Sequence, residues 1–184
     1  MRHIYITLLQ SETYVARILR MFSGDKYNHA SISFSDTLDV MYSFARKTRY
    51  NIFNAGFIEE RLDRGLMRGF TRSGFCVIEI ELSDEEYAAV LEEFEVFLRR
   101  RDAYRYNILG LTTFLTGIPI VRPDRYFCSQ FVSHLLGKTR RWREPEHLTR
   151  PVDFMRMGRV LFEGTVAEYR AYKDTACASG LRVV

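Results

Sequence analysis

Cys128 stands at the start of an expected helix, which makes it a candidate nucleophile. The segment 127–136 carries apolar residues at helical spacing and stops before Gly137. The free amides and dipole of a helix N-terminus favour the thiolate, the nucleophilic form of cysteine, and the same amides can hold an oxyanion. Of the other two cysteines, Cys76 lies in an apolar strand-like run and Cys177 lies near the C-terminus. We interpret Cys76 as a core residue and Cys177 as a bystander.

A cysteine nucleophile needs a base, and His29 is the best candidate among the four histidines. It opens the segment 29–34, whose strict alternation of apolar and small polar residues predicts a strand with His29 on the polar face. His134 follows Cys128 by six residues, which rotates a helix by about 600°, so these two side chains point in different directions. Nothing in the sequence fixes the positions of His3 and His147. A solvated histidine at a strand end remains the alternative for His29.

A third group normally orients such a base, and Ser43 is the candidate by position. A turn over residues 35–39 would pair two strands so that Ser43 lies on the His29 face, diagonal to the imidazole. A slip of one residue would present Tyr42 or Phe44 there instead. The charged competitors are Arg46, Asp36 and Asp39, and the two aspartates suit the turn itself.

The remaining pattern predicts a mixed order of strands and helices, typical of the α+β class. Strands are expected over residues 4–9, 29–34, 40–45, 75–82 and 158–163. Helices are expected over residues 11–22, 83–101, 104–116 and 127–136, with a short one from Pro151. Ser83 and Glu86 have the spacing of a capping box. The segment 46–74 has aperiodic apolar residues and predicts loops and short strands; its Phe53, Phe57 and Phe70 either line a cleft or fill the core.

Composition limits the classes of function. The 184 residues are 47% hydrophobic and fit one domain over 1–184, with a loosely held tail from about residue 174. No apolar run reaches the roughly 18–20 residues of a membrane span, and no signal-peptide pattern opens the chain, so we expect no transmembrane segment and a cytoplasmic location. Three scattered cysteines exclude a disulfide framework and a CxxC zinc site as main features.

Charge gives little support to a polyanion partner. The net charge is +4, and the tightest basic cluster, residues 99–101, ends a predicted helix, where cations complement the dipole. We therefore expect no nucleic-acid partner. The sequence leaves the oligomeric state open.

Two short segments together resemble a known family. The histidine in Tyr27-Asn28-His29-Ala30-Ser31-Ile32 precedes by about a hundred residues the cysteine in Tyr126-Phe127-Cys128-Ser129-Gln130-Phe131. This order resembles the circularly permuted papain-like proteins, the YiiX/YycO-like branch of the NlpC-type cysteine peptidase superfamily, in which the histidine strand comes before the cysteine helix. The segment Asp39 to Lys47 is also similar to bacterial members of this branch. The resemblance covers residues 1–163.

The resemblance implies a permuted papain-like fold, in which an antiparallel sheet packs against the Cys128 helix and flanking helices. It implies a catalytic triad of Cys128, His29 and a polar residue, for which Ser43 is the nearest match. Tyr126 is similar to a family tyrosine that helps to bind the oxyanion. Gln130 stands where many relatives carry an acidic residue, and we assign it to the oxyanion or substrate-binding site. Neither a metal nor an organic cofactor is implied.

The expected function is a cysteine hydrolase or acyltransferase that acts on amide or ester bonds of a small peptide-like or lipid-like substrate. The alternative is a catalytically weak or inactive papain-like module that binds an acidic ligand.

Overall fold

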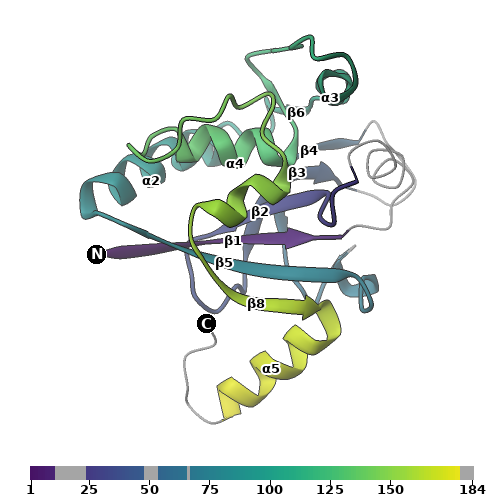
Figure 1. The fold of residues 1–184 in the computed structure, drawn as a ribbon, viewed down its shortest axis with the longest axis vertical. Helices are drawn as coiled ribbons and strands as arrows, with labels where there is room; N and C mark the ends of the chain where they lie inside the picture. Colours follow the sequence, from purple (N-terminus) through teal and green to yellow (C-terminus); the bar gives the residue numbers. More distant parts are fainter. Residues whose placement is uncertain (11–23, 48–53, 66, 179–184) are drawn as a thin grey trace.

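A six-stranded antiparallel sheet forms the centre of the protein (Figure 1). The computed structural model describes residues 1–10, 24–47, 54–65 and 67–178. The strand order is β4-β3-β2-β1-β5-β8. The strands are β1 (Arg2–Leu9), β2 (His29–Ser33), β3 (Met41–Arg46), β4 (Ala55–Glu60), β5 (Gly74–Leu82) and β8 (Arg159–Thr165). Two further strands, β6 (Arg105–Tyr106) and β7 (Arg125–Tyr126), form a separate parallel pair.

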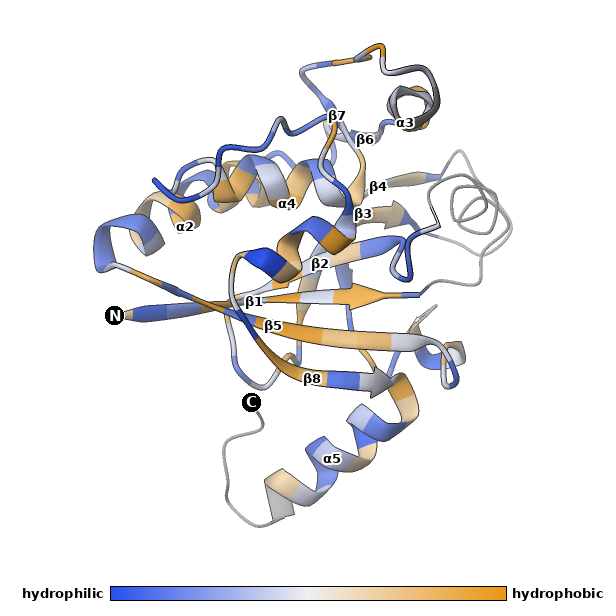
Figure 2. Ribbon diagram, in the orientation of Figure 1, coloured by the Kyte–Doolittle hydropathy of each residue, from blue (hydrophilic) through white to orange (hydrophobic). Residues whose placement is uncertain are grey.

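Both faces of the sheet are covered. The helices are α2 (Asp84–Arg99), α3 (Thr113–Thr116), α4 (Cys128–Leu136) and α5 (Val166–Ala178), with 3₁₀ turns η1 (Met67–Gly69), η2 (Leu109–Thr112) and η3 (Pro151–Arg156). One core cluster joins α2 and α4 to Ile4, Ile6 and Leu8 of β1, and a second joins α5 to Tyr5 and Leu9. Figure 2 shows β5 and the second half of β1 as mostly hydrophobic, as expected for central strands buried on both faces.

The predicted strands and two predicted helices are present, with ends that differ by a few residues. In the hairpin, Ile32 pairs with Tyr42, which is the register given by a turn over residues 35–39. In α2, Ser83 accepts a hydrogen bond from the Glu86 amide while the Glu86 side chain accepts one from the Ser83 amide, so the capping box is confirmed. Helix α4 begins at Cys128 and ends before Gly137. The mixed α+β class is therefore confirmed.

The predicted helix over residues 104–116 is present only in its second part, as a 3₁₀ turn followed by one short α-helix. Its start is strand β6, because the Arg105 and Asn107 amides donate to the carbonyls of Asp124 and Tyr126 beside β7. Only the short η2 and α3 are helical here. A tertiary pairing has overridden the local helical pattern, which no propensity argument anticipates.

Three other expectations need comment. The predicted helix over 11–22 lies outside the described residues. Residues 174–178 of the predicted loose tail form the end of α5. Phe57 is buried in the core beside Phe44 and Phe131, whereas Phe53 lies outside the described residues.

Among the residues that the structure covers, no helix is both long and apolar enough to cross a bilayer.

Candidate active site

The fold brings His29 and Cys128 together. His29 is the first residue of β2, Cys128 is the first residue of α4, and α4 packs on β2 and β3. The Cys128 side chain lies near enough to the His29 imidazole to raise its pKa. Both groups are shielded from solvent, since Cys128 is 5% exposed and the His29 side chain is 12% exposed. The candidate nucleophile and the candidate base, which come from distant parts of the sequence, thus lie close together.

Glu60, the last residue of β4, holds the other side of the imidazole. Each of its carboxylate oxygens lies 3.0 Å from Nε2 of His29, and the residue is 8% exposed. Because Nε2 faces this carboxylate, Nδ1 is the nitrogen left to serve Cys128. A carboxylate in this position fixes the ring and stabilises its charged form.

Ser43 lies near the same nitrogen but makes a weaker contact. Its Oγ is 3.4 Å from Nε2 of His29 and donates a hydrogen bond of 3.0 Å to the Ala30 carbonyl. Ser31 donates its hydroxyl proton to Glu60. The structure therefore places Ser43 on the His29 face, as predicted, but Glu60 makes the shorter contacts and carries the charge. Ser31 supports the carboxylate.

Sequence reasoning missed Glu60 for a definable reason. It ends the short strand β4, whose sequence Ala-Gly-Phe-Ile-Glu-Glu lacks clear alternation, and it reaches His29 across the intervening strand β3. The only signal is an acidic pair, Glu59 and Glu60, that closes an apolar run. That signal does not distinguish the two carboxylates, and Glu59 instead pairs with Arg101 at 3.8 Å.

The electrostatic interaction between His29 and Glu60 favours the charged forms of both side chains. Burial alone would lower the pKa of His29, but the Glu60 carboxylate and the Cys128 side chain outweigh it, so the pKa is raised well above its usual value. Burial alone would raise the pKa of Glu60, but the His29 charge and the hydrogen bonds from His29 and Ser31 hold it below its usual value. The imidazolium and the carboxylate are thus mutually stabilised in a site that excludes most water.

The start of α4 is open to an anion. Phe127 is the N-cap residue, no side chain caps the helix, and the first turn carries no acidic residue. The first intrahelical bond runs from the Phe131 amide to the Phe127 carbonyl, so the amides before it point out of the helix end. Beside Cys128, these amides are suitably placed to stabilise a developing oxyanion.

Tyr106 is a buried tyrosine that Cys128 influences electrostatically. Burial and the negative charge of Cys128 raise the pKa of the Tyr106 hydroxyl, and Arg46 acts in the opposite direction. Tyr126 has different neighbours: burial, then Glu146, Tyr104, Glu93 and Asp124, raises its pKa to about 12. Its ring packs on Phe44 and on His134. The oxyanion role of Tyr126 stays a prediction, and Tyr106, which the sequence pattern did not single out, is a second candidate for it.

Gln130 is buried at 2% exposure in the first turn of α4. Its amide oxygen has no hydrogen-bond partner among the described residues. This oxygen can accept one further hydrogen bond, and the assignment of Gln130 to the oxyanion or substrate-binding site stays a prediction.

A second histidine–carboxylate cluster lies on the same helix. His134 places Nδ1 at 2.9 Å from Glu146 and Nε2 at 3.0 Å from Glu93, and Lys138 pairs with Glu93 at 2.8 Å. Both ring nitrogens are occupied by carboxylates, in agreement with the helical rotation that separates His134 from Cys128. Within the described part of the chain, no group of three or more His, Cys, Asp or Glu side chains is arranged to hold a metal ion.

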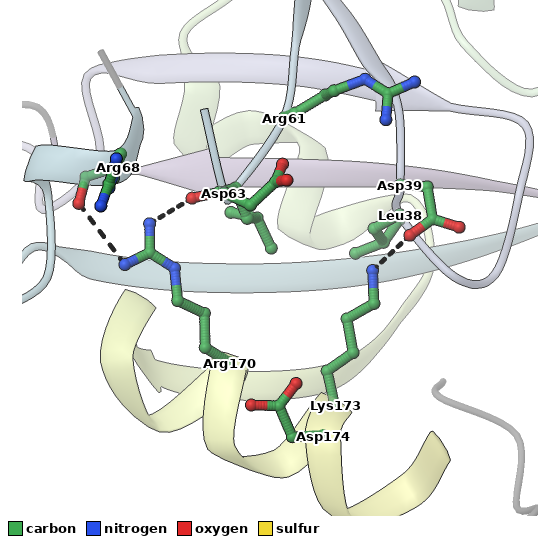
Figure 3. A pocket seen from close by; sticks show the side chains of 9 residues that line it. Leu38, Asp39, Arg61, Asp63, Arg68, Arg170, Lys173 and Asp174 are labelled. Atoms are coloured by element: carbon green, nitrogen blue, oxygen red, sulfur yellow. Dashed lines mark hydrogen bonds and ion pairs between the residues drawn. The ribbon is translucent and has the colours of Figure 1, made fainter. Parts of the chain in front are cut away.

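A cavity of about 530 Å³ lies elsewhere, between α5, the loop after β4 and the β2–β3 turn (Figure 3). Most of its charged groups already have partners. Lys173 pairs with Asp39 at 2.6 Å, and Arg170 donates to the carbonyls of Leu62 and Met67. None of the candidate catalytic residues lines this cavity.

No family model, curated protein or solved structure matches the chain. The resemblance to permuted papain-like proteins therefore stays a prediction that rests on the two short segments around His29 and Cys128.

Proposed function

We propose that the protein is a thiol hydrolase or acyltransferase that cleaves amide or ester bonds through Cys128, His29 and Glu60. The observation that carries this proposal is the buried His29 imidazole, held by the Glu60 carboxylate and lying beside the Cys128 side chain. An exposed histidine–glutamate pair is common, but a buried one in contact with a cysteine at an uncapped helix start is typical of nucleophilic catalysis.

In the proposed reaction, His29 takes the proton of Cys128, and the thiolate attacks the substrate carbonyl carbon. The tetrahedral oxyanion is held by the amides at the start of α4 and by the Tyr106 hydroxyl. As the carbon–nitrogen or carbon–oxygen bond breaks, the His29 imidazolium donates its proton to the leaving amine or alcohol. The resulting thioester then passes its acyl group to water or to an acceptor amine or hydroxyl, whose proton goes to His29. Glu60 keeps the ring oriented and stabilises its positive charge throughout.

We further propose that the fold is the permuted papain-like one. An antiparallel sheet with α4 packed on it, and a histidine strand that precedes the cysteine helix, support this assignment. The family resemblance points to a small peptide-like or lipid-like substrate.

Selective alkylation tests the nucleophile. Iodoacetamide at neutral pH, followed by peptide mass mapping, should modify Cys128 much faster than Cys76. Cys76 is an internal control because it is fully buried and its pKa is raised to about 12 by burial and by Glu163. Equal and slow modification of both cysteines would contradict the proposal.

Activity-based profiling tests the reaction class. A panel of acyl and peptidyl electrophiles should label the wild type and leave Cys128→Ala unlabelled, and the preferred probe identifies the substrate class. Failure of every probe to label the folded wild type above the Cys128→Ala background would favour the alternative, a papain-like binding module without activity.

A further inference from the structure

The chain makes an excursion between β6 and β7, over residues 107–124, which we call the arm. It contains η2 and α3, and Gly117 ends α3 in the left-handed conformation, with φ 69°. In Figure 1 the arm extends away from the sheet, beyond α4. Tyr106 lies at its root and Cys128 lies two residues after β7, so the arm adjoins the candidate active site.

Buried polar side chains hold the arm together, beside the buried Leu111. The Asn107 side chain accepts a hydrogen bond from the Gly110 amide at 2.9 Å and donates one to the Ile120 carbonyl at 3.0 Å. The Thr113 hydroxyl accepts one from the Ile120 amide at 3.3 Å. Asn107 and Thr113 are each only 1% exposed. A side chain at Gly110 would collide with Asn107, since its Cβ would lie 2.2 Å from Nδ2. The arm is thus a built unit whose shape is fixed by polar contacts.

The outside of the arm is aliphatic. Ile108 is 41% exposed, Leu109 50%, Ile118 66% and Val121 62%. These are four of the eight exposed large hydrophobic side chains in the described chain, although the arm is a small fraction of it. Such a concentration of exposed aliphatic side chains in one short segment marks an interaction site.

The charges around the arm favour an anionic, apolar partner. The arm itself carries Arg122 and Asp124, both exposed, while Arg105 on β6 and Arg125 on β7 lie at its two ends, so three arginines outnumber a single aspartate here. Arg122 directly follows Val121, so a guanidinium group stands beside the aliphatic surface. Aliphatic side chains with an arginine at their border suit the boundary between lipid acyl chains and phosphate headgroups, where the long basic side chain stays at headgroup level.

We propose that the arm is a membrane-docking element, which inserts Ile108, Leu109, Ile118 and Val121 into the apolar boundary of a bilayer that carries anionic lipids. Arg122 would contact the lipid phosphates. Docking in this way would hold the start of α4 close to the membrane surface. The inference depends on the surface of the arm and does not require that Cys128 be catalytic.

Vesicle co-sedimentation tests the proposal. The full chain is mixed with vesicles of phosphatidylcholine alone or of phosphatidylcholine with phosphatidylglycerol. We expect the wild type to sediment with the anionic vesicles, and the double variant Ile118→Asp/Val121→Asp to lose roughly tenfold or more in partition coefficient. Arg122→Gln should lose about fivefold on anionic vesicles and little on neutral ones. Cys128→Ala should bind like the wild type, which separates this test from that of the proposed function.

The matched control is Leu148→Asp/Val160→Asp, which adds the same charge at two other exposed apolar positions, 42% and 40% exposed. It should bind vesicles like the wild type. The proposal is overturned if the wild type stays in the supernatant, if the arm variant binds as well as the wild type, or if the control variant loses binding equally. Self-association that the arm variant abolishes, without vesicle binding, would also overturn it and would assign the surface to a protein partner.

Discussion

Two histidine–carboxylate clusters flank helix α4, and they differ in what surrounds the imidazole. His29 is held by Glu60 on one side and contacts Cys128 on the other, and its side chain is 12% exposed. His134 is held by glutamates on both sides and its side chain is 21% exposed. Each pair raises the pKa of its histidine, so the shift alone does not distinguish them. The difference is the candidate nucleophile: His29 leaves one ring nitrogen for Cys128, whereas both ring nitrogens of His134 face glutamates.

The largest expected effect separates the two histidines directly. His29→Ala should lower kcat/KM on any substrate found by probe profiling by about a thousandfold or more, because general acid–base catalysis is lost. His134→Ala should lower it by less than about threefold, because that ring contacts only glutamates and packing partners. Comparable losses in the two variants, both shown to be folded by circular dichroism, would contradict the comparison.

The next largest effect on kcat/KM distinguishes Glu60, beside His29, from Glu146, beside His134. Glu60→Gln should lower kcat/KM by about a hundredfold and leave a measurable rate, whereas Glu146→Gln should change it little. Glu60 raises the pKa of His29, so its removal lowers that pKa. The imidazolium, which protonates the leaving group, is then lost at a lower pH.

The pH profile distinguishes this positioning role from a merely structural one. The alkaline limb of kcat/KM against pH should move to lower pH in Glu60→Gln and stay in place in Glu146→Gln. A uniform loss of rate at every pH, with an unmoved alkaline limb, would mean that Glu60 only supports the fold.

Substitution of His134 should instead change the free energy of unfolding of the protein. Burial would lower the pKa of His134, but Glu146 and Glu93 raise it, so its charged form is stabilised in the folded state. A raised folded pKa means that this stabilisation is fully present below the ordinary histidine pKa of about 6.5 and is lost as pH rises through the folded value. In urea unfolding, His134→Gln should therefore cost about 1 kcal/mol or less below pH 6.5 and less still at alkaline pH, since the cluster is partly exposed to solvent. His147→Gln is the matched control, and an equal pH dependence in both variants would contradict the assignment.

The sequence predicts the strand of His29 and the helix of Cys128 better than it predicts the contacts that these residues make. The strand that begins at His29 and the helix at Cys128 follow from local alternation and from a clear stop at Gly137. The hairpin register follows from the length of its turn, and it places Ser43 on the correct face. Each of these patterns is local, and an element predicted from a local pattern forms where no pairing with a distant segment competes with it.

The missing part of the site depends on long-range pairing. Glu60 reaches His29 because β4 lies beside β3, and no periodicity in its own segment predicts that neighbour. Tyr106 approaches Cys128 because β6 pairs with β7, a two-residue contact in a segment whose pattern predicts a helix. Local sequence patterns identify the candidate nucleophile and the candidate base, whereas the groups proposed to act on them come from neighbouring strands.

The smallest expected effect distinguishes the two tyrosines at the β6–β7 pair. Tyr106 and Tyr126 are partners in that pair, but Cys128 raises the pKa of Tyr106, whereas Tyr126 packs on His134. If the Tyr106 hydroxyl stabilises the oxyanion, Tyr106→Phe should lower kcat by about tenfold and leave KM nearly unchanged, because the contact strengthens only in the transition state. Tyr126→Phe should leave both constants within about twofold. A rise in KM without a fall in kcat for Tyr106→Phe would place that hydroxyl in substrate binding instead, and a larger loss in Tyr126→Phe would return the oxyanion role to the residue that the family resemblance implies.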